Sequence, residues 1–251
     1  MQGRISPAVH GRVSIHMQLK EASTVITGAA RGLGAALARE LVSRGAKVVL
    51  SDIDGEDLQA LSKELGVPAL HCDVTNHWEV SALADAAEKQ SGPIRLWLNN
   101  AGVWMPYAPV EEIDFERAHK LIEVNYFGLA HGMIEAVKRM RPQKRGMIVN
   151  ILSVRSLKGK ALGAAYSASK FAAEGFTQAV RDELKDSGIS VVGVYPYRIK
   201  TTLFGENKHE DYASSMEPSE VAKIIVGNIA AEEPAEHLEI WKTDDVRTKR
   251  T

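Results

Sequence analysis

A glycine-rich turn between a β-branched segment and an amphipathic segment constrains the fold of this chain more than any other feature. Residues 24–27 read Thr-Val-Ile-Thr, and Gly28, Gly32 and Gly34 follow as a helical pattern begins. Glycines at this spacing let the backbone turn sharply and approach a ligand or a neighbouring strand, because no Cβ stands in the way. The helix that follows presents free N–H groups and the positive end of its dipole. The pattern therefore favours a cradle for the pyrophosphate of a dinucleotide over a loop that is tight only for packing.

Short apolar runs alternate with longer amphipathic stretches along the rest of the chain. Leu33, Leu37 and Leu41 recur every four residues, a spacing typical of one face of a helix. The apolar runs predict seven strands buried on both faces, at residues 24–27, 47–51, 69–72, 96–98, 147–152, 190–195 and 238–241. Strands that alternate with helices imply right-handed crossovers. The sequence thus predicts an α/β protein, a three-layer Rossmann fold with a doubly wound, mostly parallel seven-stranded sheet.

The N-terminal segment differs in composition from the rest of the chain. No acidic residue precedes Glu21, whereas Arg4, Arg12 and Lys20 are basic. Such a segment fits an organelle targeting peptide, a flexible tail, or an upstream start codon with Met17 as the true start. We expect a flexible tail over residues 1–21. We also expect one dinucleotide-binding and catalytic domain over residues 22–251, because no linker or repeat interrupts the alternation.

Composition excludes several classes of partner. The chain has 31 basic and 32 acidic residues and a net charge of -1, which gives no case for binding nucleic acid or an anionic membrane. No apolar run is long enough to span a bilayer. Cys72 is the only cysteine, so an intramolecular disulfide is impossible, and a reducing compartment, the cytoplasm, is expected. We expect the main partner to be a small-molecule substrate.

The end of the second predicted strand carries information on the choice of cofactor. Asp52 stands there and can accept hydrogen bonds from the ribose hydroxyls of an adenosine. Arg31 is the opposing signal, because a guanidinium in the glycine-rich turn can bind a 2′-phosphate. A carboxylate that faces a phosphate dianion is costly, so the sequence favours NAD over NADP.

Further motifs in register resemble the short-chain dehydrogenase/reductase family, in its single-domain form of about 250 residues. The resemblance covers nearly all of residues 22–245. The spacing from Ser153 to Tyr166 also fits the family. The motifs are the Thr-Gly-x-x-x-Gly-x-Gly loop at 27–34, Asp73-Val74, Asn99-Asn100-Ala101-Gly102, Ser153 and Tyr166-x-x-x-Lys170.

The resemblance implies contacts to a nicotinamide cofactor. The family's aspartate at the adenine ring falls on Asp73, and its residues at the nicotinamide carboxamide fall on Pro196, Ile199 and Thr201. The expected cofactor-binding set is Thr27, Gly28, Arg31, Gly32, Leu33, Gly34, Asp52, Asp73, Val74, Asn100, Ala101, Gly102, Tyr166, Lys170, Pro196, Ile199 and Thr201.

Four residues are expected to carry catalysis. Hydride transfer at carbon leaves a proton on the adjacent oxygen, so the site needs a general acid/base, and the resemblance assigns this role to Tyr166. Lys170 lies one helical turn after Tyr166, where its positive charge should lower the pKa of the phenol. Ser153 follows the fifth predicted strand and is expected to hydrogen-bond the substrate oxygen. By resemblance, Asn125 holds a water that links Lys170 to solvent.

Each of these catalytic residues also has a purely structural interpretation. Tyr-x-x-x-Lys occurs on helices by chance, Ser153 can cap a turn, and Asn125 can bond only to backbone. Because all of them follow a dinucleotide loop in register, the sequence predicts an oxidoreductase that moves a hydride between nicotinamide and a secondary alcohol or ketone.

One departure from the family leaves an alternative open. Tyr197 follows Pro196, where the family usually has glycine. A tyrosine restricts the backbone that glycine leaves free, and its ring is expected to cap the nicotinamide or narrow the substrate pocket. Tyr197 therefore favours the alternative, a non-catalytic dinucleotide-binding redox sensor or scaffold.

The sequence does not predict a metal site, and it favours self-association. His71, Cys72, Asp73 and His77 lie close together but match no zinc-binding spacing. Small residues crowd the predicted helix at residues 164–175, which would let another helix approach closely. With the family resemblance, this pattern predicts a homodimer or homotetramer.

Basic residues surround the expected mouth of the substrate pocket. An arginine there can hold a carboxylate or phosphate in a bidentate grip, which suggests a substrate with an acidic group. The alternative is that these side chains are solvated or contact the cofactor. The residues are Arg155, Lys158, Lys160, Arg198 and Lys200.

Overall fold

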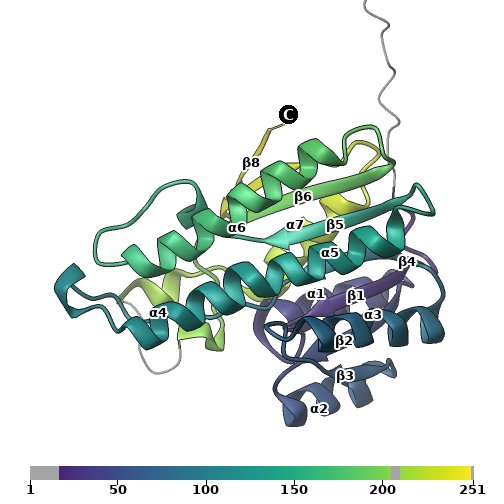
Figure 1. Ribbon diagram of the computed structural model, residues 1–251, viewed down its shortest axis with the longest axis horizontal. Coiled ribbons are helices and arrows are strands. Elements are labelled where there is room, and N and C mark those ends of the chain that lie inside the picture. The colour runs from purple at the N-terminus through teal and green to yellow at the C-terminus, as the bar shows by residue number, and fades with distance from the viewer. Residues whose placement is uncertain (1–16, 205–209, 250–251) are drawn as a thin grey trace, which may run out of the picture.

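The protein is described here by a computed structural model, which places residues 17–204 and 210–249. One sheet in the order β3-β2-β1-β4-β5-β6-β7-β8 forms the middle of three layers (Figure 1). Pairing is parallel from β3 to β7 and antiparallel between β7 and β8. The strands are β1 (Ser23–Thr27), β2 (Lys47–Asp52), β3 (Ala69–His71), β4 (Ile94–Asn99), β5 (Gly146–Ile151), β6 (Ile189–Pro196), β7 (His237–Lys242) and β8 (Asp245–Lys249).

Helices cover both faces of this sheet. Residues of α1, α2 and α7 pack into one hydrophobic cluster, and residues of α3, α5 and α6 pack into the other. The α-helices are α1 (Gly32–Ser43), α2 (Gly55–Leu65), α3 (His77–Ser91), α4 (Phe115–Ile122), α5 (Leu129–Met140), α6 (Ala164–Glu183) and α7 (Pro218–Ile229). Shorter helical turns are η1 (Val110–Glu112), η2 (Glu123–Gly128), η3 (Val154–Ser156), η4 (Thr202–Phe204) and η5 (Glu210–Ser214).

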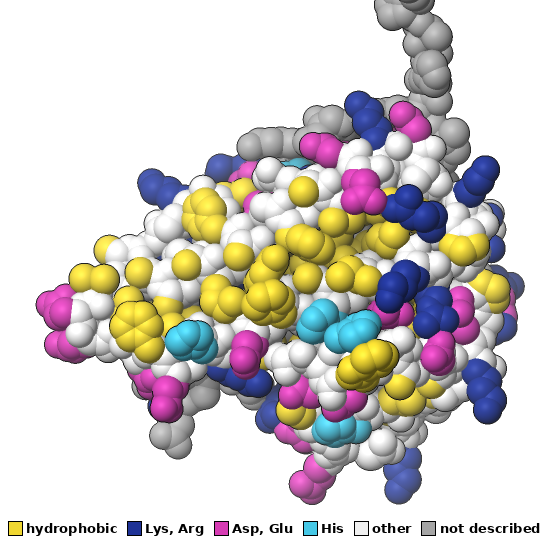
Figure 2. Space-filling view, in the orientation of Figure 1, with side chains coloured by type: hydrophobic (Ala, Val, Ile, Leu, Met, Phe, Trp, Pro, Cys, Tyr) yellow, Lys and Arg dark blue, Asp and Glu magenta, His cyan; other side chains and the backbone are white. Residues whose placement is uncertain are grey.

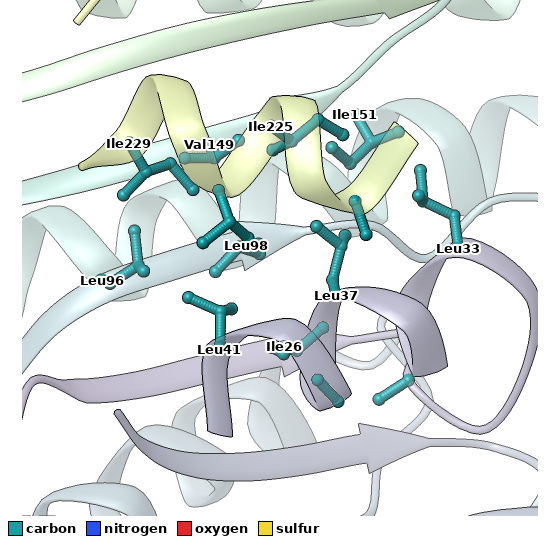
Figure 3. Close-up of a cluster of buried hydrophobic side chains, with 14 of the residues drawn as sticks. Ile26, Leu33, Leu37, Leu41, Leu96, Leu98, Val149, Ile151, Ile225 and Ile229 are labelled. Carbon is teal, nitrogen blue, oxygen red and sulfur yellow. The ribbon is translucent and has the colours of Figure 1, made fainter. Parts of the chain in front are cut away.

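The core on the α1 side follows from the leucine spacing in the sequence. Leu37 and Leu41 are completely buried, and Figure 3 shows them between the strands and the side chains of Ile225 and Ile229 on α7. Burying each such side chain is worth about 1.5–3 kcal/mol. This packing holds the first turn of α1, and therefore the glycine-rich turn, against the end of β1.

The Rossmann architecture that the sequence predicted is confirmed, with one more strand than expected. All seven predicted strands form within a few residues of their expected bounds, and β8 adds an eighth. In β8, Asp245, Arg247 and Thr248 surround Val246, its only apolar residue, so hydrophobic patterning gave no strand signal. The pairing of β8 with the exposed edge of β7 supplies the stability that its composition lacks.

The predicted boundary of the N-terminal tail is wrong for the part of the tail that the structure describes. Met17 and Leu19 belong to the tail predicted over residues 1–21, yet both are buried in the cluster that contains α1. Ala22 and Ala46, which immediately precede β1 and β2, belong to the same cluster. Residues 1–16 of the predicted tail lie outside the described residues. Within the described ranges, no helix is both long and apolar enough to cross a membrane.

Candidate active site

A cleft of about 520 Å³ opens at the carboxyl ends of the parallel strands. Strand order reverses between β1 and β4, and a crevice at such a switch point is where doubly wound sheets bind their ligands. Sixteen of the expected cofactor residues line it: Gly28, Arg31, Gly32, Leu33, Gly34, Asp52, Asp73, Val74, Asn100, Ala101, Gly102, Tyr166, Lys170, Pro196, Ile199 and Thr201.

The glycine-rich turn packs so closely that side chains are excluded from it. Gly28 has a φ of +64°, and a Cβ there would lie 2.6 Å from the Cα of Ala101. A Cβ on Gly34 would lie 2.1 Å from the Gly28 carbonyl oxygen. The Asn100 side-chain amide donates to this same oxygen at 2.7 Å. The turn is therefore fastened to the end of β4 and leaves the N-terminus of α1 facing the cleft.

Thr27 lies behind the turn rather than on the cleft surface. Its hydroxyl oxygen accepts from the backbone N–H groups of Asn100 and Ala101, at 3.2 and 3.3 Å. The same hydroxyl donates to the Leu98 carbonyl at 3.4 Å. Thr27 thus holds β1 and β4 together and shapes the turn without lining the cleft.

The carboxylate of Asp52 is fixed at one end of the cleft. One of its oxygens accepts from the Ala30 N–H at 2.9 Å, and the other accepts from the Asp54 N–H at 3.0 Å. The guanidinium of Arg31 forms an ion pair with Asp54 and lies 3.5 Å from a carboxylate oxygen of Asp57. Arg31 is therefore engaged by acidic side chains, whereas each Asp52 oxygen keeps a lone pair for another donor.

Asp73 lies beside the same end of the cleft. Burial raises the pKa of its carboxyl, but hydrogen bonds from the N–H and hydroxyl of Thr75 lower it more, so the net pKa lies below the ordinary value. The positive charge of Lys120 acts in the same direction. Asp73 is therefore ionised at neutral pH.

Ile53, Lys120 and Val124 also line the cleft, and no sequence motif predicts them there. The Ile53 side chain is 60% exposed, which suits an apolar wall for a flat ligand. Its position next to Asp52 was a usable signal. Lys120 and Val124 come from α4 and η2, and nothing in the local sequence connects them to the cleft.

Asn125 lies behind the cleft, in a π-helical turn. η2 joins α4 to α5 without a break, and such π turns are frequent at functional sites. The Asn125 amide oxygen accepts from Val103 N–H at 2.8 Å, and its nitrogen donates to the Val103 carbonyl and the Ser169 hydroxyl, both at 3.0 Å. Both N–H donors are used, so only the second lone pair of the oxygen remains for a water.

Ser153, Tyr166 and Lys170 meet at the other end of the cleft. Ser153 follows β5, and its hydroxyl oxygen accepts from the Arg155 N–H at 3.1 Å. Tyr166 lies in the first turn of α6, and Lys170 follows one turn later. The Lys170 ammonium donates to the Ile151 carbonyl at 3.2 Å. A Cβ on Gly102 would lie 3.2 Å from the Asn125 oxygen and 3.7 Å from the Lys170 nitrogen, so these two groups flank the same glycine.

The pKa of the phenol is opposite in direction to the one expected from the sequence. Burial raises the pKa of Tyr166 to about 12, against a lowering by hydrogen bonding to Ser153 and by the charge of Arg155. Tyr107 raises it further. Burial also lowers the pKa of Lys170 to about 8. Loss of solvent thus outweighs the hydrogen bond with Ser153 and the charge of Arg155, and Tyr166 is a neutral phenol at neutral pH.

Tyr197 forms part of the cleft wall without backbone strain. The residues outside glycine that have a positive φ in the described chain are Glu21, Lys144, Leu162 and Asp186, so Tyr197 adopts a conformation open to any residue. Its N–H donates to the Ile240 carbonyl at 2.8 Å. The Tyr197 ring centroid lies 5.6 Å from that of Trp241. The tyrosine is thus accommodated by packing against β7.

The cysteine at the cleft is not activated. Cys72 lines the cleft but is almost fully buried, and this burial raises the pKa of its thiol to about 12. The neighbouring His71 ring lies 3.7 Å from Glu79. Among the described residues, no group of three or more His, Cys, Asp and Glu side chains is arranged to hold a metal ion.

Comparison with known proteins agrees with this geometry. A 3-alpha-(or 20-beta)-hydroxysteroid dehydrogenase of Mycobacterium tuberculosis is 33% identical over 80% of each chain. A cis-4-hydroxycyclohexanecarboxylate dehydrogenase of Sinomonas cyclohexanicum is 35% identical over 73% of this chain and 75% of its own. The structure resembles a short-chain dehydrogenase/reductase of Burkholderia phymatum in complex with NAD, with a TM-score of 0.80, 26% identity, and coverage of 88% and 90%. Residues 22–212 match the family model described as short chain dehydrogenase, and the chain therefore belongs to the short-chain dehydrogenase/reductase family.

Proposed function

We propose that this chain is an NAD-dependent oxidoreductase that interconverts a secondary alcohol and a ketone, with Tyr166 as the general acid/base. One observation carries the proposal: a single cleft is lined both by the glycine-rich turn and by Ser153, Tyr166 and Lys170. The nicotinamide, when bound, supplies or accepts the hydride. The protein's own residues handle the oxygen and the proton.

In the reducing direction, Ser153 holds the carbonyl oxygen by a hydrogen bond, and the neutral phenol of Tyr166 gives that oxygen its proton. A pKa of about 12 keeps the proton on Tyr166 until negative charge develops on the substrate oxygen. The phenolate that forms is stabilised by the positive charges of Lys170 and Arg155. Lys170, with a pKa of about 8, is mostly protonated at pH 7 and can return a proton through a water on the free lone pair of Asn125.

The preference for NAD over NADP depends on the part of the cleft around Asp52, where the adenosine ribose is proposed to bind. Asp52 places a carboxylate there, and its two oxygens are held by the backbone N–H groups of Ala30 and Asp54. A 2′-phosphate would face this negative charge, while the nearby cation, Arg31, is engaged by Asp54 and Asp57. The balance of charge at this position is therefore unfavourable for NADP.

The two relatives support chemistry on a CH–OH or C=O group. Their printed names are those of a 3-alpha-(or 20-beta)-hydroxysteroid dehydrogenase and a cis-4-hydroxycyclohexanecarboxylate dehydrogenase, and both names specify a secondary alcohol as the substrate group. The alternative, a non-catalytic dinucleotide-binding sensor or scaffold, depended on Tyr197. Tyr197 fits without backbone strain beside a cleft of about 520 Å³, which is within the usual range for ligand sites. We therefore favour the enzyme.

A homodimer or homotetramer is part of the proposal. Hydrophobic side chains gather over α4, α5 and α6 in Figure 2. Phe127 at the end of η2, Ile134 on α5 and Phe171 on α6 are 42–48% exposed, which is unusual for such large apolar residues on one face. Of the small residues on α6, Ala168 and Gly175 are exposed, whereas Ser167, Ser169 and Ala173 face the interior. The exposed group, rather than the whole small-residue run, is the surface that a second copy would cover.

Turnover of NADH with a panel of cyclic and open-chain ketones tests the proposal. The purified wild-type protein should oxidise NADH only when a ketone is present, and the Tyr166→Phe variant provides the matched control. Tight NADH binding without turnover of any ketone or alcohol would favour the sensor alternative instead.

A further inference from the structure

The five basic residues expected at the cleft mouth are not among the residues that line the cleft, and they differ in their environment. Lys200 is paired with Glu217 at 2.5 Å. The Lys160 ammonium lies 4.6 Å from the centre of the Tyr107 ring. Lys158 is exposed on the loop that follows η3. These lysines therefore have other contacts or extend into solvent.

Arg155 has a different position. It belongs to η3, and its N–H donates to the Ser153 hydroxyl, so its backbone is tied to the proposed substrate-binding serine. Its side chain is half-buried, and the guanidinium lies 5.8 Å from the centre of the Tyr197 ring, which lines the cleft. No Asp or Glu oxygen of the described residues lies within 4 Å of it. Its charge also reaches the phenol of Tyr166, whose pKa it lowers.

The guanidinium of a second arginine, Arg198, also lies near the Tyr197 ring. Arg198 lies 5.1 Å from the centre of the Tyr197 ring. Arg198 thus brings a second positive charge to the ring beside Arg155, and an anion bound between the two guanidinium groups would be attracted by both. A guanidinium over a ring face keeps N–H groups at its edge, which can bind a carboxylate with two parallel hydrogen bonds. The half-buried position of Arg155 would strengthen such a contact relative to one in open water.

We propose that Arg155, together with Arg198, binds a carboxylate of the substrate, so that the substrate is a keto acid or the corresponding hydroxy acid. The carboxylate would lie beside Tyr197, and the carbonyl would lie beside Ser153 and Tyr166. This assignment rests on the proposed function, because it names the substrate class of that same cleft. It makes Arg155 a specificity-determining residue.

Matched pairs of ketones test the proposal in the intact chain. The probes are 4-oxopentanoate, 5-oxohexanoate and 6-oxoheptanoate, each compared with its methyl ester. Each acid and its ester differ in charge but have the same ketone, and the three acids differ in the distance between the ketone and the carboxylate. With NADH, the wild-type kcat/KM should favour the best acid over its ester by about tenfold or more. In Arg155→Ala this acid-to-ester ratio should fall by about ten- to a hundredfold, and Arg155→Lys should give an intermediate ratio.

Two controls separate recognition of the anion from other roles of Arg155. Lys158→Ala removes one positive charge from the same loop and should leave the ratio within about twofold of the wild-type value. The Kd of NADH should also stay within about twofold in Arg155→Ala. Equal losses of kcat/KM for acid and ester would contradict the proposal, and a joint loss of NADH affinity would assign Arg155 to the cofactor.

A binding measurement separates failure of this proposal from failure of the proposed function. Calorimetric titration of 5-oxohexanoate and 6-oxoheptanoate into the protein, with and without NADH, does not depend on turnover. Saturable binding that weakens at least about tenfold in Arg155→Ala would support the anion site even if no ketone were reduced. Turnover of esters with no preference for any acid, or no binding of any acid to the wild-type protein, would overturn the assignment.

Discussion

The Lys170 ammonium donates a hydrogen bond to the Ile151 carbonyl at 3.2 Å, and so joins α6 to the carboxyl end of β5. Ser153 follows this strand by two residues, and Tyr166 precedes the lysine by one helical turn. The hydrogen bond therefore connects the helix that carries Tyr166 to the strand that precedes Ser153. It also keeps the ammonium in a buried position, where its pKa is lowered to about 8.

A pH profile should reveal this lysine. Lys170 is charged below pH about 8 and neutral above it, and a neutral amine no longer stabilises the phenolate that Tyr166 forms during reduction. At saturating NADH, kcat/KM for ketone reduction should fall as the pH rises through about 8. In Lys170→Arg the side chain stays charged up to a pH of about 12. The midpoint of the fall in kcat/KM should therefore move upward by at least about one pH unit. An identical midpoint in both proteins would assign the titration to another group.

Cofactor choice should depend on Asp52 and, through Arg31, on Asp54. Removing the Asp52 carboxylate removes the repulsion of a 2′-phosphate, so Asp52→Ala should raise the affinity for NADPH relative to NADH by about tenfold. Asp54→Ala removes the shorter of the two acidic contacts of Arg31 and should add to the change in the double variant. Glu64→Ala, which unpairs Arg39 on the surface, is the matched control. Tighter binding of NADPH than of NADH by the wild-type protein would show that Arg31 dominates.

Stability should depend strongly on the leucine row of α1. Leu37 is completely buried against the sheet, so Leu37→Ala should lower the free energy of unfolding by about 2–5 kcal/mol. Val110 is 73% exposed, and Val110→Ala should change the free energy of unfolding by no more than about 0.5 kcal/mol. Urea denaturation followed by circular dichroism measures both. Similar losses in the two variants would mean that α1 does not pack as described.

Self-association should depend on the exposed aromatic face. Phe171→Glu places a charge in the surface that a second copy would cover, and burying an unpaired charge is costly. Light scattering at micromolar concentration should find a dimer or tetramer for the wild-type protein and mostly monomer for the variant. Gln59→Glu, at an exposed position of α2 on the other side of the sheet, serves as the charge control. A monomeric wild-type protein would contradict the assembly proposal.

Most of the sheet could be predicted because its strands are continuous apolar runs. Buried parallel strands need no polar alternation, so Val48, Val49 and Leu50 predict a strand from sequence alone. β8 has no such run and depends on the edge of β7 for its pairing. Met17 and Leu19 were assigned to the tail because two isolated apolar residues show no period. Their burial depends on tertiary contacts that a local pattern does not contain.

The lining of the cleft could be predicted better than the pKa values of its groups. Sixteen residues selected by motif spacing line the cleft, but motif spacing did not distinguish Thr27 and Asn125, which lie behind its surface. The direction of the Tyr166 pKa shift was also not predictable. Sequence spacing gave the nearby Lys170, but the dominant cause is burial, which depends on the whole fold. Lys120 and Val124 reach the cleft from helices distant in sequence, and no local signal reports such contacts.

The most direct test of the central claim is the turnover of Tyr166→Phe with NADH binding measured in parallel. Phenylalanine keeps the ring and removes the phenol oxygen, which is proposed to exchange the substrate proton. We predict that kcat falls at least about a hundredfold while the Kd of NADH changes by less than about threefold. Ketone reduction at a near-normal rate by this variant would contradict the proposal that Tyr166 is the general acid/base.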